Sequence, residues 1–234
     1  MTWHLGRMVG FDLETTGTDP ETARIVTACI VQCGGGQPTD SGVWLSDVDG
    51  QDIPDGAAAI HGITTEKART QGTPLEEVVG QLLGGLTQAI VSGLPIVAMN
   101  ARYDFTVLDR EAERYGLDPL PPAPVVDPLV IDRHVDKYRK GSRKLTALCE
   151  HYAVPIGDAH SADADAIAAC RVAWRQGTMH PALALMTLDE LHTVQTGWAA
   201  EQAASLQAYF RKKDPAAVVE PAWPLVPRPR GEGL

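Results

Sequence analysis

The sequence predicts an α/β fold, with a mixed β-sheet flanked by helices and a helical extension at the C-terminal end. Residues 8–14 begin with an apolar run and are predicted as a strand, residues 25–33 are predicted as a second strand because they are rich in β-branched side chains, and the glycines at 34–36 indicate a turn. Further along, short apolar segments alternate with stretches whose apolar residues recur at helical spacing. Strands in succession, followed by strand–helix alternation, are typical of a layered domain with a mixed sheet.

The first half of the chain contains most of the predicted sheet. Residues 42–46 follow the glycine turn and return as the third strand of an antiparallel meander. Two short helical segments are predicted next, over 55–61 and 64–70. A longer helix is predicted over 75–92, because its apolar residues recur every three or four positions. These residues are Leu75, Val78, Val79, Leu82, Leu83, Leu86 and Ile90.

The second half alternates between strands and helices. Residues 94–100 are predicted as a short buried strand, and 103–116 as an amphipathic helix that ends at a glycine. A proline-rich loop leads to a further strand, predicted over 124–131. Two more helices are predicted over 144–153 and 161–176.

The C-terminal part differs from the rest and divides the chain into three regions. An α/β domain over 1–177 is followed by a long amphipathic helix, whole or broken, within 178–213. This helix packs on the domain or docks a partner, and the sequence leaves both open. Residues 214–234 form a tail, and five prolines in the last twenty residues predict that it is irregular and largely open.

Composition indicates a cytoplasmic protein. The 234 residues contain no apolar run near the roughly 18 residues of a membrane helix, and the N-terminus lacks a signal-peptide core. The four cysteines lie in apolar surroundings without a C-x-x-C pair, which favours reduced core thiols. A net charge of −10 argues against a general nucleic-acid binder, although a local basic patch can still hold a phosphate backbone.

Two carboxylates lie two residues apart in the stretch MVGFDLETTG, at the end of the first predicted strand. Side chains at positions i and i+2 of a strand point to the same side, so Asp12 and Glu14 project from one face. They repel each other and resist burial, and a divalent cation removes this penalty. Mg²⁺ prefers oxygen ligands and shares its shell with water and substrate phosphates. The pair alone also fits a strand that ends in a solvated acidic loop.

Two later segments add candidate site residues. Asp104, in NARYDF, lies in the first turn of a helix that follows a strand, at the edge where open α/β sheets place their sites. In HSADADA, Ser161 can cap a helix that contains Asp165, and His160 lies in the loop before it. Asp163 is the rival of Asp165, and we interpret it as a surface residue favoured by the helix dipole.

These segments, in this order, resemble the three sequence blocks of the DEDD-type 3′–5′ exonucleases: D-x-E-T-T-G, N-x-x-x-D-F and H-x-x-x-x-D. The histidine places the resemblance in the branch that includes the proofreading subunit of bacterial replicative DNA polymerase. AIHGIT at 59–64, VVDPLVI at 125–131 and KLTALCEHYAVP at 144–155 resemble the segments between the blocks. The resemblance implies a ribonuclease H-like fold.

The resemblance also implies two-metal-ion catalysis. Asp12 would bridge two Mg²⁺ or Mn²⁺ ions, with Glu14 and Asp165 on the first ion. Asp104 would bind the second. Two such ions clamp the attacking and leaving oxygens of a phosphodiester. His160 would act as the general base, since the intrinsic pKa of histidine, about 6.5, suits proton transfer near neutral pH.

Substrate contacts are implied in the same way. Thr15 would place a backbone N–H near the terminal 3′-OH, and Ile60 and His61 would line the pocket of the last nucleotide. Asn100 and Phe105 would shape the path of the strand. The product would be a nucleoside 5′-monophosphate, released from the 3′ end.

The expected partners follow from these contacts. We predict single-stranded DNA 3′ ends as the substrate, in proofreading or repair, with RNA trimming as the alternative, because such a site reads the backbone more than the bases. The basic stretch RHVDKYRKGSRK at 133–144 contacts phosphates or is simply a solvated loop. A rival hypothesis is a docking module that binds a polymerase or another protein through the C-terminal helix. A homodimer is left open, and no membrane contact is predicted.

Overall fold

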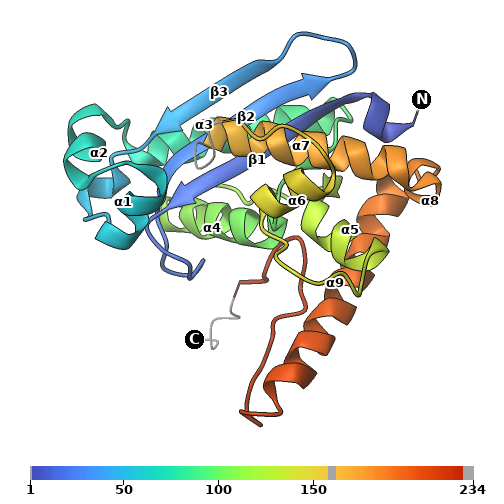
Figure 1. Cartoon of the computed structure of the whole chain (residues 1–234). Coiled ribbons are helices and arrows are strands. Elements are labelled where there is room, and N and C mark those ends of the chain that lie inside the picture. The colour runs from blue at the N-terminus through green and yellow to red at the C-terminus, as the bar shows by residue number, and fades with distance from the viewer. Residues whose placement is uncertain (1, 158–161, 229–234) are drawn as a thin grey trace.

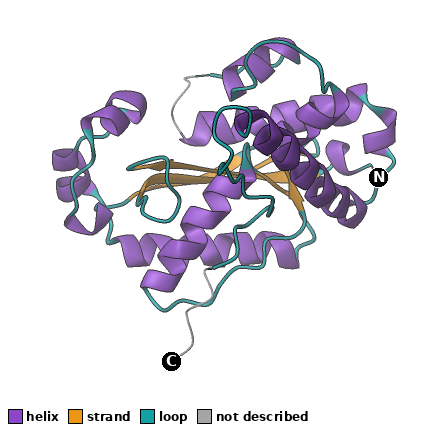
Figure 2. Cartoon of the chain, turned by 90° about the horizontal axis from the view of Figure 1, so that it is seen from below, coloured by secondary structure: helices purple, strands orange, loops and turns teal. Residues whose placement is uncertain are grey.

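The computed structural model describes residues 2–157 and 162–228, and it confirms the predicted α/β architecture. A five-stranded sheet in the order β3-β2-β1-β4-β5 lies between helices on both of its faces (Figures 1 and 2). The first three strands form an antiparallel meander, and β4 and β5 run parallel to β1. The sheet is therefore mixed.

The strands differ in length, and this difference leaves part of β1 unpaired on one side. The strand bounds are β1 Arg7–Thr15, β2 Ile25–Gly34, β3 Asp40–Leu45, β4 Ile96–Val97 and β5 Val125–Val126. β1 pairs with β2 along its whole length, but with β4 only at Val9 and Gly10. Beyond Gly10, the β4 side of β1 is open to groups from other elements.

The helices cover the sheet in two layers. Their bounds are η1 Trp3–Leu5, η2 Val48–Gly50, α1 Asp55–His61, α2 Thr65–Gln71, α3 Leu75–Val91, α4 Ala101–Arg114, α5 Pro128–Val135, α6 Leu145–His151, α7 Ala162–Met179, α8 Pro181–Ala184 and α9 Leu188–Phe210. α3 and α4 pack on one face of the sheet, and α7 packs across the other. Within the described ranges, no helix combines the length and the apolar character needed to cross a membrane.

Successive side chains of β1 point to opposite faces of the sheet, and therefore pack against different layers of helices. Val9, Phe11 and Leu13 belong to the core formed with α3 and α4. The residues between them therefore point to the opposite face, which α7 covers. Asp12 and Glu14 are among these residues, so the period of the strand directs both carboxylates toward α7.

A glycine in β1 allows α7 to lie very close to the sheet. A Cβ atom added to Gly10 would lie 2.7 Å from the carbonyl oxygen of Ala166 and 3.0 Å from Sγ of Cys170. Those distances are too short for any other residue without a shift of the α7 backbone. The close approach brings the first turns of α7 to the end of β1 that carries the two carboxylates.

The strand predicted over 124–131 is wrong beyond its first residues. Only Val125 and Val126 are in β5, and α5 starts at Pro128. The Asp-Pro pair explains the change. Asp127 is the N-cap, and its carboxylate accepts from the backbone N–H of Leu129 at 2.9 Å. Proline suits the first turn of a helix, because it lacks the N–H that would be unpaired there.

The C-terminal region is helical within the predicted range, and the described tail is exposed over most of 214–221 but packs on the domain over 222–228. The helical region is broken into α8 and α9, and α9 begins with a capping box between Thr187 and Glu190. Leu191 and Trp198 bury α9 against β5 and α5. The described part of the tail is irregular, as predicted, yet Trp223 is buried in the core beside α4. An indole of this size contributes enough buried area to hold a segment without regular structure.

Candidate metal centre

Three carboxylates converge where β1 ends against α7. Asp12, Glu14 and Asp165 each offer an oxygen, and these atoms lie within 4.8 Å of one another. The strand period supplies the first two, and the close packing of α7 on Gly10 supplies the third. The neighbouring Asp163 is not part of this group, although it is in the same turn of the helix.

The fourth predicted carboxylate approaches from the open side of β1. Asp104, in the first turn of α4, is only 4% exposed. Its Oδ1 accepts a hydrogen bond from the backbone N–H of Leu13 at 3.2 Å, beyond the point where β4 stops pairing. Asp104 therefore lies beside the backbone of the residue between Asp12 and Glu14. The structure thus brings together four predicted carboxylates from three elements.

Burial and the charges of neighbouring carboxylates make Asp12, Glu14 and Asp104 hard to ionise. Burial raises the pKa of Asp12 well above its usual range, and the charges of Asp104, Glu14 and Asp165 raise it further. Burial, followed by the charge of Asp165, raises the pKa of Glu14 to about 7. Burial also raises the pKa of Asp104, although backbone N–H groups of Leu13 and of Asp104 itself oppose the rise.

The residues present fit a divalent cation. Among the described residues, no lysine or arginine forms an ion pair with Asp12, Glu14 or Asp104. Buried anions without a cationic neighbour are costly, and they are retained where they coordinate metal. The donor set consists of carboxylate oxygens, which suits hard ions such as Mg²⁺ or Mn²⁺. His160, the predicted base, lies outside the residues that the structure describes.

The predicted substrate residues have different surroundings. Ile60, at the end of α1, is exposed, whereas His61 is half-buried and its Nδ1 accepts from the N–H of Ile63 at 3.2 Å. The Thr15 hydroxyl donates to the carbonyl of Gly17 at 2.8 Å. These three residues remain accessible to a substrate.

Asn100 and Phe105 have structural positions that the sequence does not indicate. Asn100 has a left-handed backbone, with φ of 64°, and turns the chain into α4. Phe105 is 2% exposed and packs on Phe11 with ring centroids 5.4 Å apart. The ring of Phe105 therefore lies in the core under the site, and the expectation that Phe105 shapes the path of the substrate strand stays a prediction.

Sequence reasoning missed Tyr103, whose hydroxyl contacts both the Thr15 hydroxyl, at 2.5 Å, and the carbonyl of Gly17. These contacts tie the start of α4 to the turn that follows β1. Burial raises the pKa of Tyr103, and so do the charges of Asp104 and Glu14, so the phenol keeps its proton. The available signal was its place in NARYDF, one residue before Asp104.

The basic stretch at 133–144 is only partly free. Arg139 and Arg143 both pair with the carboxylate of Asp132, which is fully buried. Tyr152 donates to the other oxygen of Asp132 at 3.0 Å. The two arginines therefore hold the loop in place, while Lys137 and Lys140 are exposed.

Comparisons with known proteins agree with this geometry. The model of an exonuclease family, RNase T, matches residues 9–173. A solved structure of exonuclease I superposes with a TM-score of 0.66 and 23% identity, over 76% of this chain and 42% of that one. E. coli exonuclease I in complex with a dA16 oligonucleotide gives 0.65 and 22% over the same shares, and its complex with SSB-Ct gives 0.62 and 21%. A search of curated sequences returned no significant match.

These matches bear on the fold, on the length of the chain and on the carboxylates of the site. At such low identities the solved structures show a shared fold, which confirms the predicted exonuclease architecture. This chain spans less than half of the length of the exonuclease I chains that it matches. The family match covers the segment that contains Asp12, Glu14, Asp104 and Asp165.

Proposed function

This chain belongs to the RNase T exonuclease family, and on that premise we propose that it is a metal-dependent 3′–5′ exonuclease acting on single-stranded DNA. The observation that supports this proposal most strongly is the group of carboxylates at the end of β1, in which Asp104 is buried and Asp12, Glu14 and Asp165 are half-buried. Ion pairs with lysine or arginine are absent for Asp12, Glu14 and Asp104 among the described residues. The products would be nucleoside 5′-monophosphates.

The residues divide the work as follows. Asp12, Glu14 and Asp165 would hold one divalent ion, and Asp104 together with Asp12 would hold a second. Bound divalent ions supply charge stabilisation for the phosphodiester and acidify a water molecule. The imidazole of His160 takes the proton of the attacking water, since its intrinsic pKa lies near neutral pH.

The 3′ end of the DNA strand is recognised by residues of α1 and by Thr15 at the end of β1. Ile60 offers an exposed apolar surface to the terminal base, and His61 supports it from the same helix. Burial lowers the pKa of His61, so this side chain is neutral at pH 7. Thr15 offers its backbone beside the terminal 3′-OH. These contacts are to the sugar, the phosphate and a base face, so they favour an unpaired strand of any sequence.

A protein partner would bind at the C-terminal end of α9. Leu206, Tyr209 and Phe210 are exposed there. They adjoin an open groove of about 570 Å³ that α9 shares with basic side chains of Arg133 and Lys137. We place the polymerase or other protein contact on this surface. Sedimentation velocity tests whether the partner is a second copy of this chain. If the protein is a monomer at micromolar concentration, the proposed partner is a different protein.

The first experiment is a gel time course with 5′-labelled DNA and RNA of one sequence, each with Mg²⁺, Mn²⁺ or EDTA. A metal-dependent ladder that shortens from the 3′ end supports the proposal, and the faster lane identifies the preferred polymer. No shortening in any lane would contradict it and favour the docking module. In the same assay, His160→Ala should lose most of the rate and the pH dependence near neutrality. An unchanged pH profile would remove its role as base.

A further inference from the structure

The C-terminal tail returns from the end of α9 and runs along α4, the helix that carries Asp104 (Figure 1). Residues on one face of α4 hold it by hydrogen bonds and ion pairs. Arg102 donates to the carbonyl of Glu220 at 2.5 Å, the N–H of Val226 donates to Thr106 Oγ1 at 3.1 Å, and Arg228 pairs with both oxygens of Asp109 at 2.9 and 3.0 Å. The tail is therefore bound along about two turns of the helix.

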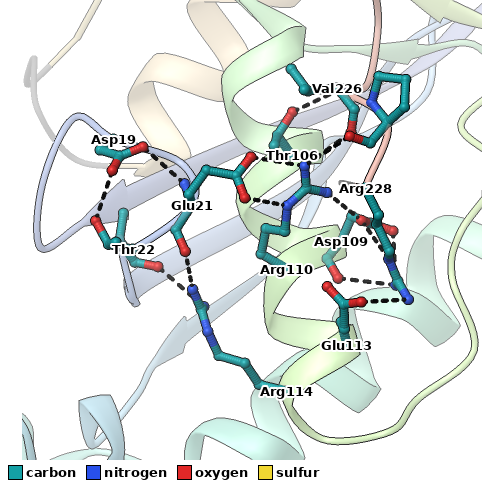
Figure 3. A network of polar contacts seen from close by, with 12 residues as sticks. Asp19, Glu21, Thr22, Thr106, Asp109, Arg110, Glu113, Arg114, Val226 and Arg228 are labelled. Atoms are coloured by element: carbon teal, nitrogen blue, oxygen red, sulfur yellow. Dashed lines mark hydrogen bonds and ion pairs between the residues drawn. The ribbon is translucent and has the colours of Figure 1, made fainter. Parts of the chain in front are cut away.

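The same row of α4 residues is also tied to the turn that follows β1. Figure 3 shows Arg110 between the two segments. Its guanidinium donates to both oxygens of Glu21 at 2.8 Å, and also to the carbonyls of Val226 and Pro227. Arg114 donates to the backbone carbonyl of Glu21 at 2.6 Å. The tail and the turn beyond Glu14 are therefore held by the same helix.

At the start of α4, the tail reaches a buried carboxylate. Trp223 Nε1 donates to Oδ2 of Asp127 at 3.2 Å, and both residues are buried. The same carboxylate accepts from the backbone N–H groups of Asn100 at 3.1 Å and Ala101 at 3.0 Å, besides those that open α5. In the described ranges, no lysine or arginine pairs with Asp127. Its hydrogen-bond donors are N–H groups, and the charge of Arg133 acts on it without a direct ion pair.

Asp127 performs the capping that Asn100 does not. Asn100 precedes α4 but makes no side-chain cap, so the first N–H groups of the helix depend on Asp127. Asp104 lies three residues after Ala101, within the same turn. A displacement of the cap therefore displaces Asp104 relative to Leu13, to which it is hydrogen-bonded.

The backbone of Asp127 is fixed as well, by α9. Gln195 is buried and accepts from the N–H of Asp127 at 2.8 Å, while its amide donates to the carbonyl of Val125 at 2.9 Å. His192 Nδ1 accepts from the N–H of Val125 at 3.1 Å. These side chains pair with the outer edge of β5 as another strand would. Asp127 is thereby held at its backbone by α9 and at its carboxylate by the tail.

We propose that the tail is part of the nuclease site, with Trp223 as a positioning residue that acts through Asp127 and the start of α4 on Asp104. The inference rests on the proposed function, because it concerns the cation ligand that Asp104 supplies there. It assigns a role to a segment that lies far outside residues 9–173, the part matched by the family model. Loss of the tail contact should then change the affinity for the second cation and the rate of turnover more than the affinity for substrate.

The test replaces the indole N–H and keeps an aromatic ring. Trp223→Phe is compared with Trp3→Phe, because Trp3 is equally buried at 6% and donates a similar bond, to the carbonyl of Leu183 at 2.8 Å, away from Asp127. Binding of Mn²⁺ is followed by the EPR signal of the free ion, without substrate. Turnover of single-stranded DNA gives kcat and KM. Thermal unfolding of both variants measures the loss of melting temperature that follows from removal of a buried indole.

We expect Trp223→Phe to weaken the weaker of two Mn²⁺ sites about tenfold, as loss of outer hydrogen bonds does elsewhere. Its kcat should fall by a similar factor with KM little changed. Trp3→Phe should lower the melting temperature as much as Trp223→Phe does, but it should leave Mn²⁺ affinity and kcat unchanged. Arg228→Gln, which disturbs no core residue, should move both readouts in the same direction by less.

Two outcomes separate the failure of this inference from that of the proposed function. If wild-type protein degrades DNA and Trp223→Phe behaves as Trp3→Phe does, the tail is only structural and the inference is overturned. If wild-type protein neither binds Mn²⁺ nor shortens DNA, the proposed function itself fails.

Discussion

Two groups of carboxylates that the fold shields from solvent, one wholly and one in part, have opposite surroundings in this molecule. Glu111 and Asp132 are fully buried, and each is neutralised by arginine: Arg24 lies 2.8 Å from Glu111, and Arg139 lies 2.7 Å from Asp132. Asp12 and Asp104 are held close to other carboxylates instead, without such a pair in the described structure. The first group links elements of the fold, whereas the second fits the cation that we propose it binds.

The contrast indicates which acids serve stability and which serve chemistry. An unpaired buried charge costs several kcal/mol, so a chain that used Asp12 and Asp104 only for packing would gain by replacing them. We therefore expect opposite effects on stability in the two groups. Removal of a carboxylate relieves repulsion at the site of Asp12 and Asp104, but it leaves an unpaired arginine beside Glu111 or Asp132. The following experiments test that difference, from the largest expected effect to the smallest.

Asp12→Ala should abolish exonuclease activity. Loss of a ligand shared by both ions should cost more than the roughly 10³-fold loss seen when one transition-state donor is removed. The metal-free variant should be at least as stable as wild type, because one of the mutually repelling carboxylates is gone. Single-turnover cleavage and urea unfolding measure the two quantities. Wild-type turnover would contradict the two-metal assignment.

Glu111→Gln should have the converse effect. It leaves the buried guanidinium of Arg24 without its closest anion, 2.8 Å away, at a cost of about 3 kcal/mol in the free energy of unfolding. Urea unfolding of the metal-free protein measures this loss. Activity per folded molecule should remain within a factor of two, since Glu111 is not a proposed ligand. A loss of activity without a loss of stability would break the distinction between the groups.

Metal should stabilise the protein more at high pH. Burial and Asp165 raise the pKa of Glu14 from 4.5 to about 7, so the folded protein retains a proton that the unfolded chain has lost. Stability of the metal-free protein therefore falls as pH rises from about 4.5 through 7. Because cations bind the deprotonated carboxylate, Mn²⁺ should raise the melting temperature more at pH 8 than at pH 6. Glu14→Gln should reduce this difference, and equal shifts in the wild type would contradict the prediction.

The smallest effect is expected for the exposed cations of the basic stretch. Lys137→Ala combined with Lys140→Ala removes two side chains outside the Asp132 ion pairs. If both contact phosphates, the slope of log affinity for single-stranded DNA against log salt should decrease by about 1.4. Fluorescence anisotropy in EDTA, which prevents cleavage, measures this slope. An unchanged slope would leave these lysines as solvated residues only.

Local pattern was enough to predict most elements and the places of the candidate carboxylates, whereas their roles as metal ligands were implied by the resemblance to the DEDD-type exonucleases. The period of two along residues 8–14 directed Asp12 and Glu14 to one face, and helical spacing predicted the helices that carry Asp104 and Asp165. These inferences need only a few neighbouring residues, because strand and helix periods are local properties of the backbone. Where a local signal was misread, as in the Asp-Pro pair at 127–128, a helix start was mistaken for continued strand.

The tertiary structure decided which polar residues are paired with which. Nothing near Trp223 in the sequence indicates that its indole caps Asp127, nearly a hundred residues earlier, or that Arg228 pairs with Asp109. The same holds for Arg139 and Arg143, which look like free cations until Asp132 is placed between them. Side-chain pairing depends on distances between remote segments, and only the packed fold sets those distances. The sequence alone therefore determined the carboxylates and the elements that carry them, while the fold determined what holds those elements in position.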